Sequence, residues 1–292
     1  LDTAYMYNGN EAALGEIFAR NPGLRERVYI ATKLPIARCE ASGDFDTYLE
    51  RSLKRLRTDH IDYYLVHNVT SATAWDRLSS LGFEKWADAQ KRSGRISNIG
   101  FSYHGPKADF PVLLDSFDWD FCQIQYNYMN EDYQAGTAGL MAAAERGLPV
   151  IVMEPLLGGK LASELPAGAR RALSDAGLSD DPVRLALRWV WNHPEATVVL
   201  SGMNTLDQLS QNAETADSAF PGSLEAAEET AIKKAREHIA QNYRIPCTGC
   251  GYCMPCPKGI NIPMCFAAYN TSFAHGWYQG MHQYITASGA MV

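Results

Sequence analysis

Four side chains near the N-terminus have the chemistry needed to reduce a carbonyl group. Asp2 and Tyr7 lie in the stretch that opens the chain, and Lys33 and His67 each end a strand-like segment. A tyrosine with a pKa of about 10 is a slow acid near neutrality, but an ammonium beside it favours the phenolate and lowers that pKa. Asp2 would keep Lys33 charged and oriented, and a neutral His67 could donate a hydrogen bond to the substrate oxygen. The set predicts reversible hydride transfer between a carbonyl and an alcohol.

Each of these residues alone has a simpler interpretation. A tyrosine before Asn-Gly is most often a packed surface aromatic, and a single His67 is more often a hydrogen-bonded polar residue than a catalyst. Lys33 is the more informative one, because a charge at the end of a buried strand is costly unless it is paired. The order of the four residues and their positions at strand ends favour catalysis.

A second group of reactive side chains lies near the C-terminus, where Cys247, Cys250, Cys253 and Cys256 follow one another at equal spacing. Disulfides between such close neighbours rarely have suitable geometry, so a metal or iron–sulfur site in a reducing compartment, the cytoplasm, is the better prediction. The run resembles the bacterial ferredoxin pattern, although its last gap is two residues rather than three. Structural zinc on four thiolates is the alternative. The fourth ligand stays open between Cys256, Cys265 and a later cysteine.

The elements that must position these groups alternate between strand and helix up to about residue 216. Strict alternation predicts a parallel sheet with helices outside it. With a strand end at Leu1, seven of the eight strands of a (β/α)₈ TIM barrel are counted, so we expect a barrel whose first strand is missing and a sequence trimmed at both ends. An open doubly wound sheet is disfavoured, because no G-x-G-x-x-G follows an early strand. The expected strands are 28–33, 61–66, 96–101, 119–125, 149–154 and 197–201, and the expected helices are 10–20, 44–57, 74–92, one near 140, 182–192 and 205–216. In the helix over 44–57, Phe45, Leu49, Leu53 and Leu56 recur at a spacing of three to four residues, and Asp44 is the expected N-cap.

The sequence predicts two regions, a barrel over residues 1–220 and a small α-helical region over 221–292 that contains the cysteines. The second region would comprise a polar helix over 224–242, the cysteine loop, and an aromatic helical remainder.

Composition limits the partners. The formal charge of −7 and the pI near 5.5 argue against nucleic acid, since no basic stripe is present. No apolar run approaches the roughly 20 residues of a membrane helix. A small carbonyl or alcohol substrate, with a redox partner protein as a further option, fits better.

Motifs at nearly every strand end, over about residues 1–215, resemble those of the aldo-keto reductases. They are Asp2-Thr3-Ala4 with Tyr7, Thr32-Lys33-Leu34, Val66-His67, Ile99-Gly100-Phe101-Ser102, Gln123-Ile124-Gln125-Tyr126-Asn127, Glu154-Pro155-Leu156 with Gly158-Gly159, and Ser201-Gly202-Met203 with Gln208 and Asn212. The cysteine run and the trailing Gly259-Ile260-x-Ile262-Pro263 are similar to the subgroup that carries a C-terminal ferredoxin-like 4Fe-4S extension.

The resemblance implies a nicotinamide dinucleotide cofactor, NADP(H), and a catalytic tetrad of Asp2, Tyr7, Lys33 and His67. NAD(H) stays open, because the segment 201–212 lacks an arginine for the extra phosphate. Tyr103 and Met153 depart from the family pattern, where Asn and an aromatic residue are frequent. The implied cofactor contacts are Ser102 and Gln125 at the carboxamide, Pro155, Leu156, Gly158 and Lys160 at the pyrophosphate, and Ser201, Gly202, Met203, Gln208 and Asn212 at the adenosine.

Two other functions remain open on the sequence alone. The chain could be a non-catalytic, cofactor-binding regulatory subunit, or an electron carrier whose barrel is only a scaffold and whose metal is structural zinc. An intact tetrad favours an oxidoreductase, in which the iron–sulfur cluster exchanges electrons with the hydride chemistry.

Overall fold

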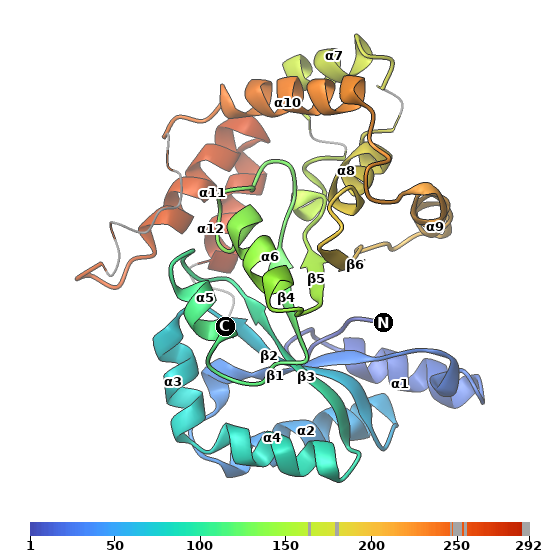
Figure 1. Cartoon of the computed structure of the whole chain (residues 1–292), viewed down its shortest axis with the longest axis vertical. Coiled ribbons are helices and arrows are strands. Elements are labelled where there is room, and N and C mark those ends of the chain that lie inside the picture. Colours follow the sequence, from blue (N-terminus) through green and yellow to red (C-terminus); the bar gives the residue numbers. More distant parts are fainter. Residues whose placement is uncertain (163–164, 179–180, 246, 248–252, 254–255, 288–292) are drawn as a thin grey trace. The chain divides into compact units, whose positions relative to one another are not determined.

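The computed structural model describes the chain except residues 163–164, 179–180, 246, 248–252, 254–255 and 288–292 (Figure 1). Two compact units are present, residues 1–124 with 139–151 and residues 125–138 with 152–292. The strands form a six-stranded sheet in the order β1-β2-β3-β4-β5-β6, and the pairs from β1 to β4 are parallel. The predicted α/β class with a parallel sheet is confirmed.

Every predicted strand has a counterpart. The strand end expected at Leu1 is an isolated parallel bridge between Asp2 and Ala31, with the Ala31 N–H donating to the Leu1 carbonyl at 2.8 Å. The six strands are β1 Ala31–Pro35, β2 Ile61–Val69, β3 Ile96–Tyr103, β4 Phe121–Gln125, β5 Val150–Met153 and β6 Ala196–Val199.

The helices include two that the sequence analysis did not find, α5 and α7. Three short 3₁₀ turns, Arg25–Arg27, Ile36–Arg38 and Leu157–Gly159, lie between the longer elements. The α-helices are α1 Asn10–Arg20, α2 Gly43–Leu56, α3 Ala72–Ser80, α4 Phe83–Arg92, α5 Asp109–Leu114, α6 Gly136–Glu145, α7 Ala167–Ser174, α8 Pro182–Trp191, α9 Leu206–Ser218, α10 Ala226–Ala240, α11 Ile262–Ala274 and α12 Trp277–Ala287.

Two predictions about helix boundaries were wrong. The helix expected over 74–92 is divided into α3 and α4 by Gly82, whose φ of 88° no helix interior allows. Asp44 is not the N-cap of α2. It lies in the first turn, and its carboxylate accepts the N–H groups of Glu40 and Ala41 at 2.8 and 2.9 Å. The loop before the helix is thereby fixed.

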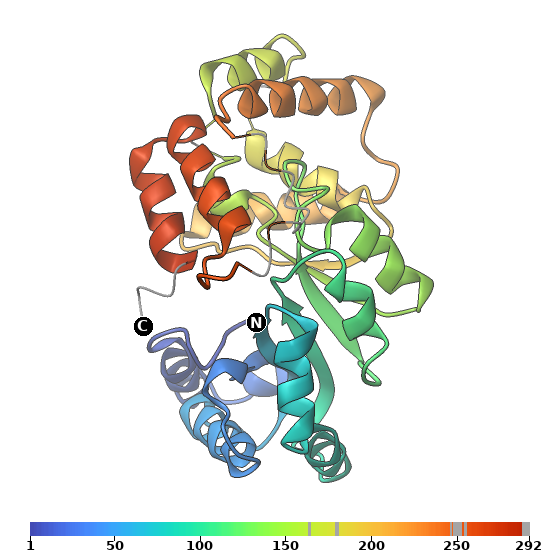
Figure 2. The same ribbon diagram turned by 90° about the vertical axis from the view of Figure 1, so that its left-hand side faces the viewer.

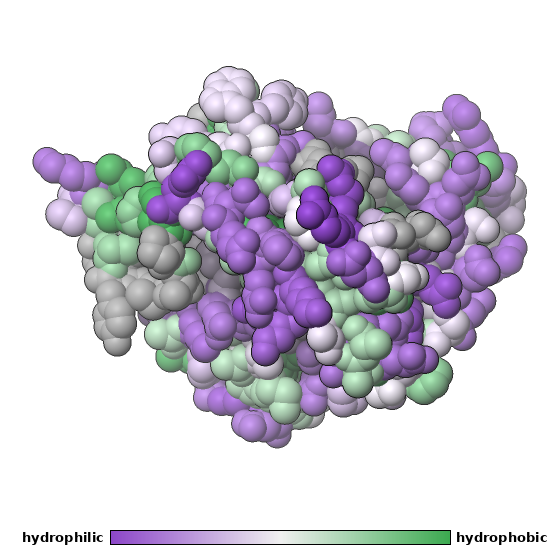
Figure 3. Space-filling view, turned by 90° about the horizontal axis from the view of Figure 1, so that it is seen from above, coloured by the Kyte–Doolittle hydropathy of each residue, from purple (hydrophilic) through white to green (hydrophobic). Residues whose placement is uncertain are grey.

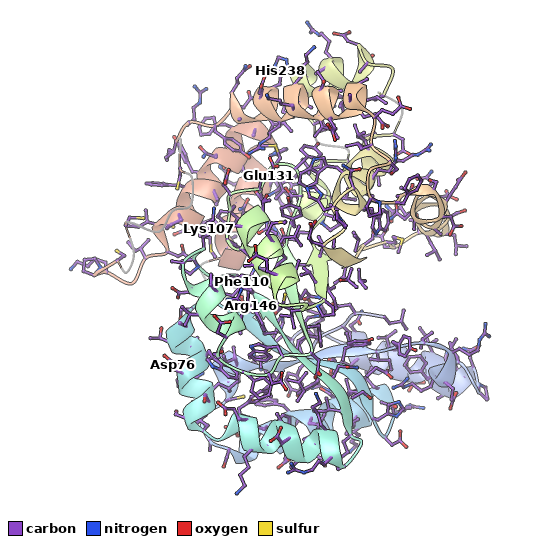
Figure 4. All side chains as sticks on the ribbon, in the orientation of Figure 1. Asp76, Lys107, Phe110, Glu131, Arg146 and His238 are labelled. Atoms are coloured by element: carbon purple, nitrogen blue, oxygen red, sulfur yellow. The ribbon has the colours of Figure 1, made fainter. Side chains whose placement is uncertain are left out.

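In the first unit, α2, α3 and α4 lie along β1, β2 and β3 (Figure 1). The predicted apolar spacing of α2 is confirmed, because its inward residues Phe45, Leu49 and Leu56 are completely buried. Aromatic side chains continue this core, and the rings of Trp75 and Trp119 lie 4.8 Å apart. Arg146 follows α6 and is labelled in Figure 4. It binds Asp115 through two hydrogen bonds of 2.7 and 2.8 Å.

In the second unit, α7 packs beside α10, and α11 beside α12 (Figure 2). His238 of α10 lies over Gly168 of α7, where a Cβ atom would come within 2.9 Å of its Nδ1 (Figure 4). The surface over α7 and α10 is largely hydrophilic (Figure 3), as the sequence of α10 predicted. Among the described helices none is both long and apolar enough to cross a membrane.

Gly15 fixes the approach of α1 to the end of α2. A Cβ atom at this position would lie 2.0 Å from the carbonyl oxygen of Arg55 and 3.0 Å from the carbonyl carbon of Leu56. Backbone atoms cannot move away as a flexible side chain can, so only glycine fits here.

The Gly15→Ala variant should therefore lose about 1 to 3 kcal/mol of unfolding free energy through overpacking. Gly43→Ala is the matched control, since nothing lies within 4 Å of its Cβ position. Its stability should be unchanged or higher by up to about 1 kcal/mol. Urea denaturation followed by circular dichroism measures both, and equal midpoints for the two variants would show that the close packing of α1 is not limiting.

Candidate active site

Lys33 and Asp2 form a buried ion pair at the first strand. Lys33, on β1, is 1% exposed, and its Nζ lies 2.7 Å from the Asp2 carboxylate and 2.7 Å from the Thr3 carbonyl oxygen. Burial lowers the pKa of Lys33, while the charge of Asp2 and its hydrogen bond oppose that shift. The carboxylate therefore offsets part of the cost of burying the ammonium.

Tyr7 and His67 lie beside this pair. The Lys33 Nζ is 5.1 Å from the centroid of the Tyr7 ring. The rings of Tyr7 and His67 meet edge to face, with centroids 5.8 Å apart. Tyr7 is 46% exposed, so its ring is open to solvent and to a ligand. The structure thus brings together the four residues that the sequence singled out.

His67 is held neutral. Burial is the main cause that lowers its pKa to about 3, and the positive charge of Lys33 and the neighbouring His104 lower it further. A neutral imidazole can donate one hydrogen bond without adding charge to the site. This is the form in which the sequence analysis expected His67 to act.

The sequence analysis assigned no role to Gln123, which binds Asp2, or to Glu11, which binds Thr32 next to Lys33. Gln123, on β4 and 1% exposed, donates from Nε2 to the second oxygen of Asp2 at 3.2 Å. Glu11 is 2% exposed and accepts hydrogen bonds from Thr32 at 2.7 Å and Arg55 at 3.1 Å. Gln123 belonged to a motif that resembles the family, but the sequence analysis assigned it no role. Glu11 gave no signal, because a glutamate in the first helical turn is ordinary.

Ser102 binds the backbone of Asn68, the residue that follows His67. Its Oγ accepts the N–H of Asn68 at 2.8 Å, at a register shift between β2 and β3 where Asn68 has a φ of 61°. The hydroxyl hydrogen of Ser102 is left to donate elsewhere.

In the second unit, the loop after β5 has unusual backbone geometry. Glu154 and Leu157 have φ values of 53° and 51°, which cost non-glycine residues about 1 to 3 kcal/mol each and often mark functional sites. The side chain of Asn127 donates to the Glu154 carbonyl at 3.0 Å. Pro155 and Lys160 of this loop are buried, and Gly158 is exposed with a φ of 66°.

The other residues expected at the cofactor also lie in the second unit. Gln125, at the end of β4, is 4% exposed. Asn212 donates to the Ser201 hydroxyl at 2.9 Å, which joins the two ends of that segment. The Gln208 amide oxygen accepts the Asn204 N–H at 2.9 Å, and the Gln208 N–H donates to the hydroxyl of Thr205, the N-cap of α9, at 3.2 Å. Gly202 and Met203 are exposed.

The cysteine run is described only in part. Cys247 and Cys253 are exposed and Cys256 is half-buried, all three as free thiols, whereas Cys250 lies outside the described residues. The Lys258 N–H donates to the Cys256 sulfur at 3.4 Å. Within the described part of the chain, no three His, Cys, Asp or Glu side chains gather as a metal site would require.

The family model described as "Aldo/keto reductase family" matches residues 1–229. The chain belongs to this family. It is therefore an aldo-keto reductase, an oxidoreductase. It is 31% identical to the uncharacterized oxidoreductase YrpG of Bacillus subtilis, over 71% of this chain and 74% of the relative. It is 28% identical to a 6-dehydroglucose reductase of Agrobacterium fabrum, over 72% and 74% of the two chains.

A solved structure agrees with this assignment. The holo form of the aldo-keto reductase AKR11C1 from Bacillus halodurans superposes with a TM-score of 0.64 at 25% identity, over 80% of this chain and 81% of that chain.

The neutral state of His67 predicts a pH dependence of stability. Its pKa of about 3 in the folded protein lies below the value of about 6.5 in an unfolded chain. The unfolded chain therefore binds more protons between these values, and the unfolding free energy falls as the pH drops, by up to about 1.4 kcal/mol per pH unit.

The His67→Gln variant lacks this contribution, so its urea midpoint should fall less than that of the wild type between about pH 7 and about pH 5. His282→Gln alters an exposed histidine of α12 and should keep the wild-type dependence. Parallel curves for the wild type and His67→Gln would mean that His67 is not held neutral.

Proposed function

We propose that this enzyme interconverts an aldehyde or ketone and the corresponding alcohol, with NADP(H) as hydride carrier and Tyr7 as the proton donor. The observation that supports this most is the buried Lys33–Asp2 pair, whose ammonium lies 5.1 Å from the Tyr7 ring. A buried cation beside a phenol, with a neutral imidazole at the ring edge, suits proton transfer to an oxygen.

The residues would divide the chemistry between them. The Lys33 ammonium favours the phenolate of Tyr7, so the phenol proton can pass to the carbonyl oxygen in reduction and return in oxidation. Neutral His67 donates a hydrogen bond to the same oxygen and orients the substrate. Asp2 and the Thr3 carbonyl keep Lys33 in place. A bound nicotinamide dinucleotide would supply or accept the hydride.

The chain's own groups suit such a cofactor. Ser102, which already accepts from Asn68, has a hydroxyl hydrogen to offer to the carboxamide, and Gln125 supplies a buried amide. In the strained loop with Pro155 and Leu156, the exposed Gly158 would let the pyrophosphate approach the backbone, and Lys160 would supply a cation. The adenosine of the cofactor would be bound by Ser201, Gly202, Met203, Gln208 and Asn212. The absence of an arginine from 201–212 leaves NAD(H) as the alternative.

We further propose that the six-stranded sheet belongs to a (β/α)₈ barrel over residues 1–220, followed by a helical region over 221–292. The extent of the structural likeness supports the barrel. In the helical region, Cys247, Cys250, Cys253 and Cys256 would hold a [4Fe-4S] cluster, with structural zinc as the alternative. The N–H to sulfur hydrogen bond at Cys256 is of the kind that tunes such clusters. The cluster would exchange electrons with a redox partner protein in the cytoplasm.

Replacing the proton donor tests the catalytic proposal. The Tyr7→Phe variant should lose about 10²- to 10⁴-fold in kcat for carbonyl reduction, since general acid catalysis contributes on that order. Its Kd for NADPH, measured by fluorescence titration, should be unchanged. Tyr29→Phe is the matched control, because Tyr29 is 71% exposed and should keep full activity.

Full turnover by Tyr7→Phe would remove Tyr7 from the mechanism. The wild-type protein could instead bind NADPH and show no turnover with any of a panel of aldehydes and ketones. That result would favour a non-catalytic regulatory subunit as the function of this protein.

Iron and zinc analysis with a visible spectrum tests the cluster. Anaerobically purified wild type should contain iron and sulfide and absorb broadly in the visible, and this band should bleach with NADPH if the cluster accepts electrons. Cys253→Ser should lose the band, whereas Cys122→Ala, which changes a buried thiol of the first unit, should keep it. A colourless protein containing zinc would leave a plain carbonyl reductase with a structural metal.

A further inference from the structure

Tyr5, two residues before Tyr7, is held by one face of α2. The guanidinium of Arg55 lies over the Tyr5 ring, with its Cζ 4.4 Å from the ring centroid. Arg51 donates from Nη1 to the Tyr5 hydroxyl at 3.2 Å, and the Tyr48 ring meets the Tyr5 ring edge to face, with centroids 4.9 Å apart. Positions 48, 51 and 55 are separated by three and four residues, so these side chains share one face of the helix.

Tyr5 belongs to the tight turn that ends at Tyr7. The Tyr7 N–H donates to the Ala4 carbonyl at 3.0 Å, which closes the turn. Within it, Arg55 donates from Nη1 to the Tyr5 carbonyl oxygen at 3.5 Å. Both the ring and the backbone of Tyr5 are thus held by α2. Because Tyr5 is fixed, the turn has little freedom to carry the Tyr7 ring away from the Lys33 ammonium, 5.1 Å from its centroid.

The buried carboxylate of Glu11 directs Arg55. It accepts from the same Nη1 of Arg55 at 3.1 Å, and its other oxygen accepts from the Thr32 hydroxyl at 2.7 Å. Arg55 has a long side chain that is 42% exposed, so a fixed partner is needed to keep its guanidinium over Tyr5. Glu11 lies in α1, and Thr32 precedes Lys33 on β1. The pair therefore joins β1 to α1 and α2, which lie side by side (Figures 1 and 2).

We propose that Arg55 and Glu11 are positioning residues, which fix the turn that carries Tyr7 and thereby keep its phenol beside the Lys33 ammonium and aimed at the substrate oxygen. The Lys33–Asp2 pair fixes the start of the opening stretch, whereas Arg55 and Glu11 fix its turn. This inference rests on the proposed function, because it takes Tyr7 as the proton donor.

The test is the kcat of the full chain at saturating NADPH, with para-nitrobenzaldehyde as the carbonyl probe. Arg55→Met keeps the apolar stem and removes the guanidinium. It should lower kcat about 10- to 100-fold, since a small misplacement of a reacting group costs on that order. Arg55→Lys keeps a cation for the Tyr5 ring and for Glu11, so it should recover most of this loss. Arg57→Met is the matched control, because it removes another ion pair between α2 and α1, with Glu16, and should keep the wild-type kcat.

Further variants separate positioning from folding, with the folded enzyme counted by NADPH titration. Tyr5→Leu removes the ring but keeps the Glu11–Arg55 pair, and it should lower kcat as Arg55→Met does. Glu11→Gln keeps an oxygen that accepts a hydrogen bond and loses the charge, so its kcat should fall less, about 3-fold. In the Tyr7→Phe background, Arg55→Met should cause no further loss, because Arg55 acts through the Tyr7 hydroxyl. A merely structural role would lower kcat alike in both backgrounds.

A wild-type kcat in Arg55→Met, or losses that multiply in the Tyr7→Phe background, would overturn the inference and leave the proposed function intact. The proposed function itself would be overturned by full turnover in Tyr7→Phe. A wild-type protein that reduces neither para-nitrobenzaldehyde nor any other carbonyl of the panel would have the same consequence.

Discussion

The buried ammonium group of Lys33 constrains how the chain segments around it are arranged in the first unit. Lys33 is almost completely removed from water, and such a charge is tolerated only where anionic or carbonyl oxygens replace the lost hydration. Asp2 and the Thr3 carbonyl provide these oxygens, so the opening stretch must lie against β1, where Asp2 bridges Ala31. Tyr7 follows in the same stretch and is thereby carried to the ammonium.

The strand register completes the arrangement. Lys33 pairs with Leu65, and His67 lies two residues further along β2, on the same face of the sheet as Leu65. The polar end of β2 therefore comes to the ammonium, whose charge helps to keep the imidazole neutral. One buried cation thus sets the place of Tyr7 and adds to the burial that keeps His67 neutral.

The sequence predicted much of this arrangement, because the spacing of apolar and charged residues along the chain indicates which side chains face the core. The apolar spacing of Phe45, Leu49 and Leu56 indicated the inward face of α2, and a lysine in a buried strand indicated a paired charge. That lysine lies in the middle of β1, whereas the sequence had predicted it at the end of the strand. The prediction failed where one residue decides the local backbone. Gly82 breaks a helix that periodicity alone would continue, and Asp44 binds the loop before its helix instead of capping it.

The amino-acid sequence by itself determined the order of strands and helices, the chemical groups at the strand ends and the family, because side-chain period and motif spacing are local properties. Tertiary structure alone decided which distant groups meet. Gln123 reaches Asp2 across 121 residues, and Lys160 reaches Gln283 across 123. The pKa of His67 is likewise a tertiary property, because desolvation and neighbouring charges depend on what packs around the ring and not on the residues beside it in sequence.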